Sequence, residues 1–232
     1  MSFEIPEAWK GLYPQVPKDL DREPFVNLIP ICVFALSLAL LVTVVISVKA
    51  KKKHGLFDKG LLFYFALSVL IHFNLERYYA HHLDDILKPG NRHPMARIWR
   101  YYGTSDTRWL GRQFDVPASQ YSCMYGLEIM AAWGCGPTIL ASIVLYVLEH
   151  PARWIIQAVA VTIQAYGLLI TWLPPIYEKM QSVPVNDPYM YYGLYIAMQS
   201  PWIFVPLAVI GQSCYVITKV FRKGKQNKQK AQ

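Results

Sequence analysis

Five long stretches of this chain carry almost no charged residues, and they constrain its fold more than any other feature. An α-helix needs about 20 apolar residues to cross the hydrocarbon core of a bilayer. We therefore predict five spans, at about residues 26–48, 60–80, 119–148, 154–174 and 189–218. With 54% hydrophobic and 16% charged residues, the 232-residue chain leaves little for a separate soluble domain. The predicted fold is all-α, one polytopic membrane domain over residues 1–232 with five transmembrane helices, an intramembrane cavity and a basic tail at 219–232.

The formal net charge of +8 would by itself be compatible with nucleic-acid binding. The high apolar content makes anionic lipid headgroups the expected partner instead, and we expect no nucleic acid. The four cysteines lie inside apolar runs without CxxC spacing, so neither a disulfide framework nor a zinc site is indicated. We expect all four to be small core residues: Cys32, Cys123, Cys135 and Cys214.

The basic residues closest to span ends predict the orientation of the chain. Lys49 and the lysines at 51–53 follow the first span, and the basic tail follows the fifth. Lysine and arginine beside span ends favour the cytosolic side, which predicts a cytosolic C-terminus. Lys228 and Lys230 also resemble the dilysine signal that retrieves membrane proteins to the endoplasmic reticulum. We therefore expect a multi-pass protein of the endoplasmic reticulum membrane.

Residues 77–115 form the one sizeable segment expected outside the membrane, and they are rich in tyrosine, tryptophan and arginine. These residue types prefer the headgroup zone of a bilayer. Gly90 and Pro94 should interrupt helical structure. We predict a cap of short pieces lying on the membrane surface.

Ionisable residues inside spans are costly and mark a functional site by default, and three of them stand out. His72 and Glu76 are four positions apart, so a helix places them on one face within hydrogen-bonding reach. Glu128 lies near the middle of the third uncharged run, without a basic residue in that run. One interpretation is structural, with His72 and Glu76 bonded to each other and Glu128 bonded to a hydroxyl. The other is an acid/base relay built from two carboxyls and an imidazole facing one cavity.

Metal chemistry is the weaker explanation of the polar residues at the end of the second span. Four side chains there are compatible with metal ligation: His81, His82, Asp84 and Asp85. Six histidines in the whole chain are too few for the multiple histidine boxes of membrane di-iron oxygenases. We therefore expect a polar interface here, and neither a metal nor a cofactor. The sequence also lacks the GxSxG, P-loop and dinucleotide-binding motifs.

Trp202 lies in the fifth span between Pro201 and Pro206. Two prolines distort a membrane helix and free backbone groups. The tryptophan then either packs against the distortion or offers an aromatic face to a cation.

Taken in order along nearly the whole chain, these residues resemble the emopamil-binding protein family of sterol isomerases. The matching positions are His72 to Glu76, Trp99 to Trp109, Glu128 with Gly136-Pro137, His150-Pro151 with Arg153, Gln164 with Tyr166-Gly167, and Trp202 with Pro206. The resemblance implies a five-helix enzyme of the endoplasmic reticulum. Its implied reaction moves a sterol double bond from the 8 to the 7 position without a cofactor.

The resemblance also implies roles for individual residues. Glu76 and Glu128 would carry protons, His72 would polarise or relay, and Trp202 would face a carbocation. The implied substrate-binding residues are Tyr102, Asp106, Arg108, Trp109, Ala131, Gln164, Tyr166 and Gln199. Lipophilic amines, which mimic the carbocation, are the implied inhibitors, and a homodimer is an open alternative to a monomer.

The chain departs from the family pattern at three polar positions. Ala131 stands where a threonine is expected, Gln199 where an asparagine is expected, and Leu168 where an aspartate or similar group is expected. Three functions therefore stay open. The first is sterol 8,7-isomerisation, and the second is isomerisation or cyclisation of another polycyclic terpenoid or polyprenyl compound in a specialised pathway. The third is sterol binding without catalysis.

Overall fold

The computed structural model describes residues 25–49, 55–86, 88, 90–114 and 118–230. Within these ranges the chain is helical and contains no strand. Five helical segments are long and apolar enough to cross a membrane: Ile29–Lys49, Leu56–Asp85, Ser122–Val147, Arg153–Tyr177 and Tyr189–Asn227. The predicted all-α polytopic fold with five spans is confirmed.

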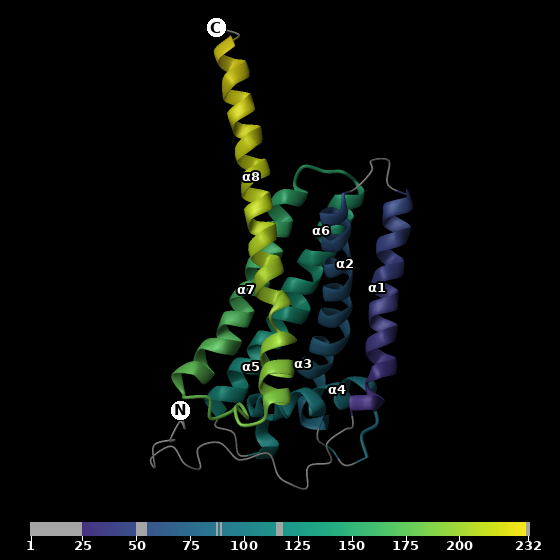
Figure 1. Cartoon of the computed structure of the whole chain (residues 1–232), viewed down its shortest axis with the longest axis vertical. Coiled ribbons are helices and arrows are strands. Elements are labelled where there is room, and N and C mark those ends of the chain that lie inside the picture. Colours follow the sequence, from purple (N-terminus) through teal and green to yellow (C-terminus); the bar gives the residue numbers. More distant parts are fainter. Residues whose placement is uncertain (1–24, 50–54, 87, 89, 115–117, 231–232) are drawn as a thin grey trace.

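The spans run alternately up and down in Figure 1 and pack side by side. The bundle is formed by α1 (Ile29–Lys49), α2 (Leu56–Leu70), α6 (Gly136–Val147), α7 (Arg153–Tyr177) and α8 (Pro201–Lys230). Buried residues from α2, α6, α7 and α8 form the main core, which includes Leu62, Ile139, Val161 and Val209. Helix α1 packs chiefly against α2 and leaves many large apolar side chains exposed. It is a strongly apolar span, with a mean hydropathy of 2.9. Such a surface is stable when lipid covers it.

Three of the spans contain a π-helical turn. The turn η3 (Ile71–Glu76) joins α2 to α3 (Arg77–His82), and η6 (Ala131–Cys135) joins α5 (Ala118–Met130) to α6. The turn η7 (Tyr189–Ala197) precedes α8. A π-helical turn widens the helix locally, shifts the side chains that follow it, and occurs often at functional sites.

A cap covers the end of the bundle opposite to the projecting C-terminal part of α8 (Figure 1). It consists of η4 (Leu83–Asp85), α4 (Pro94–Gly103) and η5 (Thr107–Phe114). Pro94 occupies the first helical position of α4, where its missing N–H has no cost, and Gly90 adopts a φ of +77° in the preceding turn. The expected short pieces are therefore present.

Aromatic side chains hold the cap together and fix it to the spans. The rings of Tyr79, Trp99 and Trp109 pack with centroid separations of 4.7 to 5.6 Å. The Trp99 indole Nε1–H donates a hydrogen bond of 2.8 Å to the backbone carbonyl of Leu75, inside η3. Because a π-helical turn changes the backbone pairing of the helix, this indole supplies a partner where the regular pattern is interrupted.

The expectation that all four cysteines are core residues is wrong for three of them. Cys135 is buried, whereas Cys32, Cys123 and Cys214 are exposed on the outer surface of spans. A thiol is apolar enough to face lipid, so an apolar run alone does not distinguish core positions from lipid-facing ones.

Candidate active site

His72 and Glu76 form a hydrogen-bonded pair inside η3. The ring nitrogen Nδ1 of His72 bonds to the Glu76 carboxylate, as their spacing predicts. The imidazole is 3% exposed and the Glu76 side chain 14% exposed. An ionisable pair this deep in a span requires polar partners, and the neighbouring spans supply them.

Gln164 of α7 contacts the other nitrogen of His72. Its amide nitrogen lies 3.1 Å from His72 Nε2 and donates a 3.3 Å hydrogen bond to Ser68 Oγ. Its amide oxygen accepts a 3.0 Å hydrogen bond from the Tyr64 hydroxyl. Gln164 was predicted as a substrate-binding residue, but here its polar groups bond to protein groups around the imidazole.

Sequence reasoning missed Tyr64 and Ser68. Both lie in α2 at intervals of four residues before His72, so the three side chains share one face of the second span. That spacing was the available signal: a stripe of polar residues within an otherwise apolar helix.

Glu128 is buried in α5, one turn before η6, with 3% of its surface exposed. The turn η6 that follows it packs on η3, the turn that holds His72 and Glu76. Its oxygen Oε2 is buried and has no hydrogen-bond partner in the part of the chain that the structure describes. The structural interpretation, in which a neighbouring hydroxyl satisfies this carboxyl, therefore lacks support at Oε2.

A glycine allows the third span to approach the imidazole closely. The η6 turn packs on η3, and a Cβ atom placed on Gly136 would lie 3.1 Å from His72 Cβ. That separation is tighter than most Cβ contacts in proteins, so His72 would have to move by a few tenths of an ångström. Ala131, the first residue of η6, is half-buried near the same contact between the two π-helical turns.

Trp202 reaches this cluster through an aromatic contact. Its ring is half-buried, and its centroid lies 6.0 Å from that of Tyr64 at an interplanar angle of 57°. The order of contacts is therefore Trp202, Tyr64, Gln164 and His72, drawn from α8, α2, α7 and η3.

Gln199 and Tyr102 connect the fifth span to the cap. The amide nitrogen of Gln199 donates a hydrogen bond to the Tyr102 hydroxyl, while its oxygen Oε1 is buried without a partner among the described residues. Burial, followed by the nearby Asp106 carboxylate, raises the pKa of Tyr102 well above its usual value. Tyr102 therefore stays a neutral phenol.

Asp106 and Arg108 form a fully buried ion pair in the cap. The guanidinium makes three contacts to the Asp106 carboxylate, at 2.5 to 3.2 Å, and donates a 2.6 Å hydrogen bond to the Thr171 carbonyl of α7. Burial alone would lower the pKa of Arg108, but the carboxylate outweighs it and the net pKa lies above the ordinary value. The adjacent Trp109 packs in the aromatic cluster of the cap.

Tyr166 is not brought to this cluster. Its side chain is 63% exposed on the outside of α7. Leu168, two residues further on, is buried instead. The resemblance to the sterol isomerases located this stretch of α7 but not the direction of each side chain.

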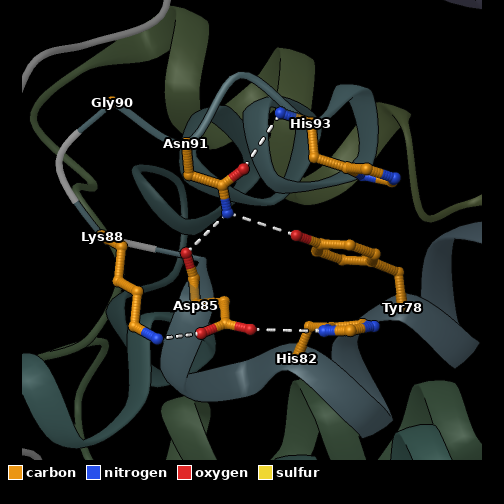
Figure 2. A pocket seen from close by; sticks show the side chains of 7 residues that line it. All are labelled: Tyr78, His82, Asp85, Lys88, Gly90, Asn91 and His93. Atoms are coloured by element: carbon orange, nitrogen blue, oxygen red, sulfur yellow. Dashed lines mark hydrogen bonds and ion pairs between the residues drawn. The ribbon is translucent and has the colours of Figure 1, made fainter.

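Of the four polar residues at the end of the second span, Figure 2 shows His82 and Asp85, whose side chains bond to each other. The Asp85 carboxylate bonds to both Lys88 and His82, and the Asn91 amide donates to the Tyr78 hydroxyl at 3.2 Å. The described ranges contain no group of three or more histidine, cysteine or acidic side chains placed to hold a metal ion.

The comparison with known families decides the assignment. The sequence profile of EXPERA, the expanded EBP superfamily, matches residues 94–213, which is more than half of the chain. The chain belongs to the EXPERA family. The matched range contains Glu128, Gln164 and Trp202, whereas His72 and Glu76 precede it. The predicted kinship with the emopamil-binding sterol isomerases is confirmed.

Curated proteins with similar sequences carry two kinds of name. A probable 3-beta-hydroxysteroid-Delta(8),Delta(7)-isomerase of Arabidopsis thaliana is 26% identical over 207 residues, 88% of this chain and 87% of that protein. A protoglabretal synthase of Citrus sinensis is 27% identical over 175 residues, 75% of this chain and 77% of that protein. An isomeliandiol synthase of Ailanthus altissima is 31% identical over 149 residues, 64% of this chain and 66% of that protein.

Proposed function

We propose that this EXPERA protein is a membrane-embedded isomerase that moves a ring double bond of a sterol from the 8 to the 7 position. One observation carries the proposal. Among the described residues, Glu128 is buried with an oxygen that has no hydrogen-bond partner, and the turn η6 that follows it packs on the turn that holds the hydrogen-bonded pair of His72 and Glu76. Isomerase names among the relatives support the same reaction class.

The reaction needs one group that gives a proton and one that takes a proton. Protonation of the ring alkene forms a C–H bond and leaves a tertiary carbocation. Loss of a proton from a neighbouring carbon returns its C–H electrons to form the new double bond, so the net change is the position of the alkene. Glu76 and Glu128 are the proposed proton carriers, His72 is the group that polarises or relays, and exclusion of water protects the cation.

The aromatic face of Trp202 is the proposed partner of the carbocation. A tryptophan face attracts a nearby cation by about 0.5–2 kcal/mol. Tyr64, 6.0 Å away between ring centroids, links Trp202 to the hydrogen-bonded cluster that holds His72.

A second candidate acts by the same chemistry on a different substrate. Synthases named for protoglabretal and isomeliandiol are as similar to this chain as the sterol isomerases are. The chain also has Ala131 and Gln199 where the sterol-isomerase pattern has threonine and asparagine. Isomerisation or cyclisation of a polycyclic terpenoid is therefore the alternative to the sterol reaction, and sterol binding without turnover is the third outcome of the test.

Product analysis in cells that lack their own sterol 8,7-isomerase separates these functions. Recovery of 7-unsaturated sterols on expression of the chain supports the first proposal. If these sterols do not return, purified protein is incubated with candidate polycyclic terpenoids, and a product with a shifted double bond or new ring supports the second. If the protein binds sterol but forms neither product, the result supports sterol binding without catalysis.

Carboxyl-to-amide variants test the chemistry within the same assays. Glu76→Gln and Glu128→Gln keep the side-chain shape and remove the group that gives or takes the proton, so turnover should fall on the order of 100-fold or more. Glu149→Gln is the matched control, because Glu149 is exposed in the turn after α6. Activity near that of the wild type in either site variant would return that carboxyl to a structural role. His72→Ala should also lower turnover severely, since it removes the hydrogen-bond partner of Glu76.

The cellular location and orientation form a separate proposal. The chain is a multi-pass membrane protein, and we propose the endoplasmic reticulum membrane with the basic C-terminal tail in the cytosol. Basic residues beside the first and fifth spans support this orientation. A glycosylation acceptor added at the C-terminus should stay unmodified, whereas modification there would reverse the orientation.

Lipophilic amines are the proposed inhibitors. An ammonium group held between the carboxyls and Trp202 would mimic the charge of the carbocation, and mimics of a transition state bind more tightly than substrates. Competition between an amine and a neutral sterol in purified membranes measures this preference. Homodimer formation stays a prediction. Chemical cross-linking in intact membranes tests it.

A further inference from the structure

We propose that Tyr64 and Gln164 are positioning residues that hold His72 as a neutral imidazole with its hydrogen on Nδ1. The consequence for catalysis, that Glu76 is held as an ionised proton acceptor, rests on the proposed isomerase function. The juxtaposition of Tyr64, Gln164 and His72 comes from α2, α7 and η3, so no single sequence motif contains it.

The first step concerns the orientation of the Gln164 amide. Its oxygen lies 3.0 Å from the Tyr64 hydroxyl, which donates, and its nitrogen lies 3.3 Å from Ser68 Oγ. The side chains of Tyr64, Ser68 and Gln164 are all buried. In this orientation the amide oxygen is the acceptor for the buried Tyr64 hydroxyl hydrogen, and the amide nitrogen faces away from Tyr64.

The second step concerns His72. An amide nitrogen only donates hydrogen bonds, and Gln164 presents it 3.1 Å from His72 Nε2. With the Gln164 amide in this orientation, Nε2 accepts and carries no hydrogen. A neutral imidazole has one N–H, so that hydrogen is on Nδ1.

The third step concerns Glu76. The Nδ1–H group points at the Glu76 carboxylate and donates to it. This hydrogen bond orients the Glu76 carboxyl and is stronger to its ionised form than to its neutral form. In this arrangement Tyr64 and Gln164 act on Glu76 through His72, as the outer hydrogen bonds of catalytic histidines do elsewhere.

The network also explains the burial of a polar amide in the middle of a span. An unsatisfied amide in an apolar region is costly, and Gln164 is only 5% exposed. Three protein contacts satisfy it, and all three lie around the imidazole. This distinguishes Gln164 from Gln157 on the same helix, whose amide donates to Ser213 Oγ of α8 at 2.8 Å.

Nitrogen NMR of protein labelled with nitrogen-15 in its histidines tests the proposal without substrate. The chemical shift of a ring nitrogen distinguishes a bare nitrogen from a protonated one, and His72→Asn assigns the signals. At neutral pH the wild-type protein in detergent micelles should show a bare Nε2 and a protonated Nδ1 at His72. A protonated Nε2, in either the other tautomer or the imidazolium form, overturns the proposal.

Two variants then test the positioning residues. Tyr64→Phe removes only the hydroxyl, so the amide loses its fixed orientation and the His72 signals should change to a mixture of tautomers. Gln164→Glu replaces the donor with an acceptor, so Nε2 should become protonated. Gln157→Glu is the matched control on the same helix and should leave the His72 signals unchanged. Unchanged His72 signals in Tyr64→Phe or Gln164→Glu refute the role of that residue.

Kinetics add a readout that packing alone would not produce. If the substrate of the proposed isomerase is identified, Tyr64→Phe should lower kcat roughly 10- to 100-fold with little change in KM, since it misplaces a reacting group rather than the substrate. A change confined to KM contradicts the positioning role. Absence of any isomerase activity in the wild-type protein would refute the proposed function but would leave the NMR result and the tautomer assignment intact.

Discussion

Replacing Asp106 by asparagine should destabilise the whole protein, because it leaves the charge of Arg108 buried and uncompensated. Arg108 is 1% exposed and Asp106 is fully buried. The guanidinium of Arg108 makes three contacts to the Asp106 carboxylate, and asparagine cannot neutralise its charge. The remaining hydrogen bond to the Thr171 carbonyl keeps Arg108 in place but supplies no negative charge.

The size of the effect follows from the burial of the pair. Removing one partner of a buried ion pair costs about 3–5 kcal/mol of unfolding free energy. In a chain of this length, 1 kcal/mol corresponds to about 2–4 °C in Tm. Asp106→Asn should therefore lower Tm by about 6–20 °C. The double variant Asp106→Asn with Arg108→Met removes both charges and should recover more than half of that loss.

Thermal unfolding in detergent micelles, followed by circular dichroism, measures these changes. Lys88→Met is the control, because Lys88 pairs with Asp85 on the exposed surface of the cap and its removal should leave Tm unchanged. A Tm for Asp106→Asn close to that of the wild type would refute the structural role. The single variant Arg108→Met completes the comparison. A double variant whose loss of Tm equals the sum of the losses in Asp106→Asn and Arg108→Met would refute the structural role as well. A raised KM with unchanged Tm would instead support the substrate-binding role that the family resemblance implies for Asp106.

Three other outcomes are expected. Gly136→Ala should lower activity and Tm, because the added Cβ would lie 3.1 Å from His72 Cβ and force η3 and η6 apart; activity and Tm equal to those of the wild type would show that the contact relaxes freely. Trp202→Leu should weaken the binding of a lipophilic amine by about 0.5–2 kcal/mol and that of a neutral sterol by less, and equal losses would make Trp202 a packing residue. Ala131→Thr combined with Gln199→Asn should raise the ratio of kcat/KM for the sterol to that for the best terpenoid substrate, since buried polar groups reject substrates that leave them unpaired. An unchanged ratio would show that these positions do not select the substrate.

The five spans and the His72–Glu76 pair could be predicted because each depends on local pattern. A span follows from a run of apolar residues, and a pair at positions i and i+4 follows from helix geometry. Glu128 could be identified because placing an ionisable side chain in an apolar segment costs free energy, and no partner residue was needed for that inference. None of these inferences required knowledge of how the helices pack.

The partners supplied by other spans could not be predicted in this way. Tyr64 reads as an ordinary aromatic residue of α2 until Gln164 is placed opposite it, 100 residues later in the chain. The direction of the Tyr166 side chain could not be predicted either. Its position in a family motif did not reveal that the side chain points outward. Facing directions depend on the rotation of each helix, and π-helical turns change that rotation without a clear sequence signal.

The cap contacts three spans close to a residue of the proposed chemistry and holds a fourth at Thr171. In the second span, Trp99 bonds to the Leu75 carbonyl, immediately before Glu76. In the third, Met124 packs in the aromatic cluster of the cap, one turn before Glu128. The ion pair holds α7 at Thr171, and Tyr102 holds Gln199 three residues before Trp202. Because these four contacts share one compact segment, the separation of the two carboxyls and Trp202 depends on the folding of a cap that contains none of them.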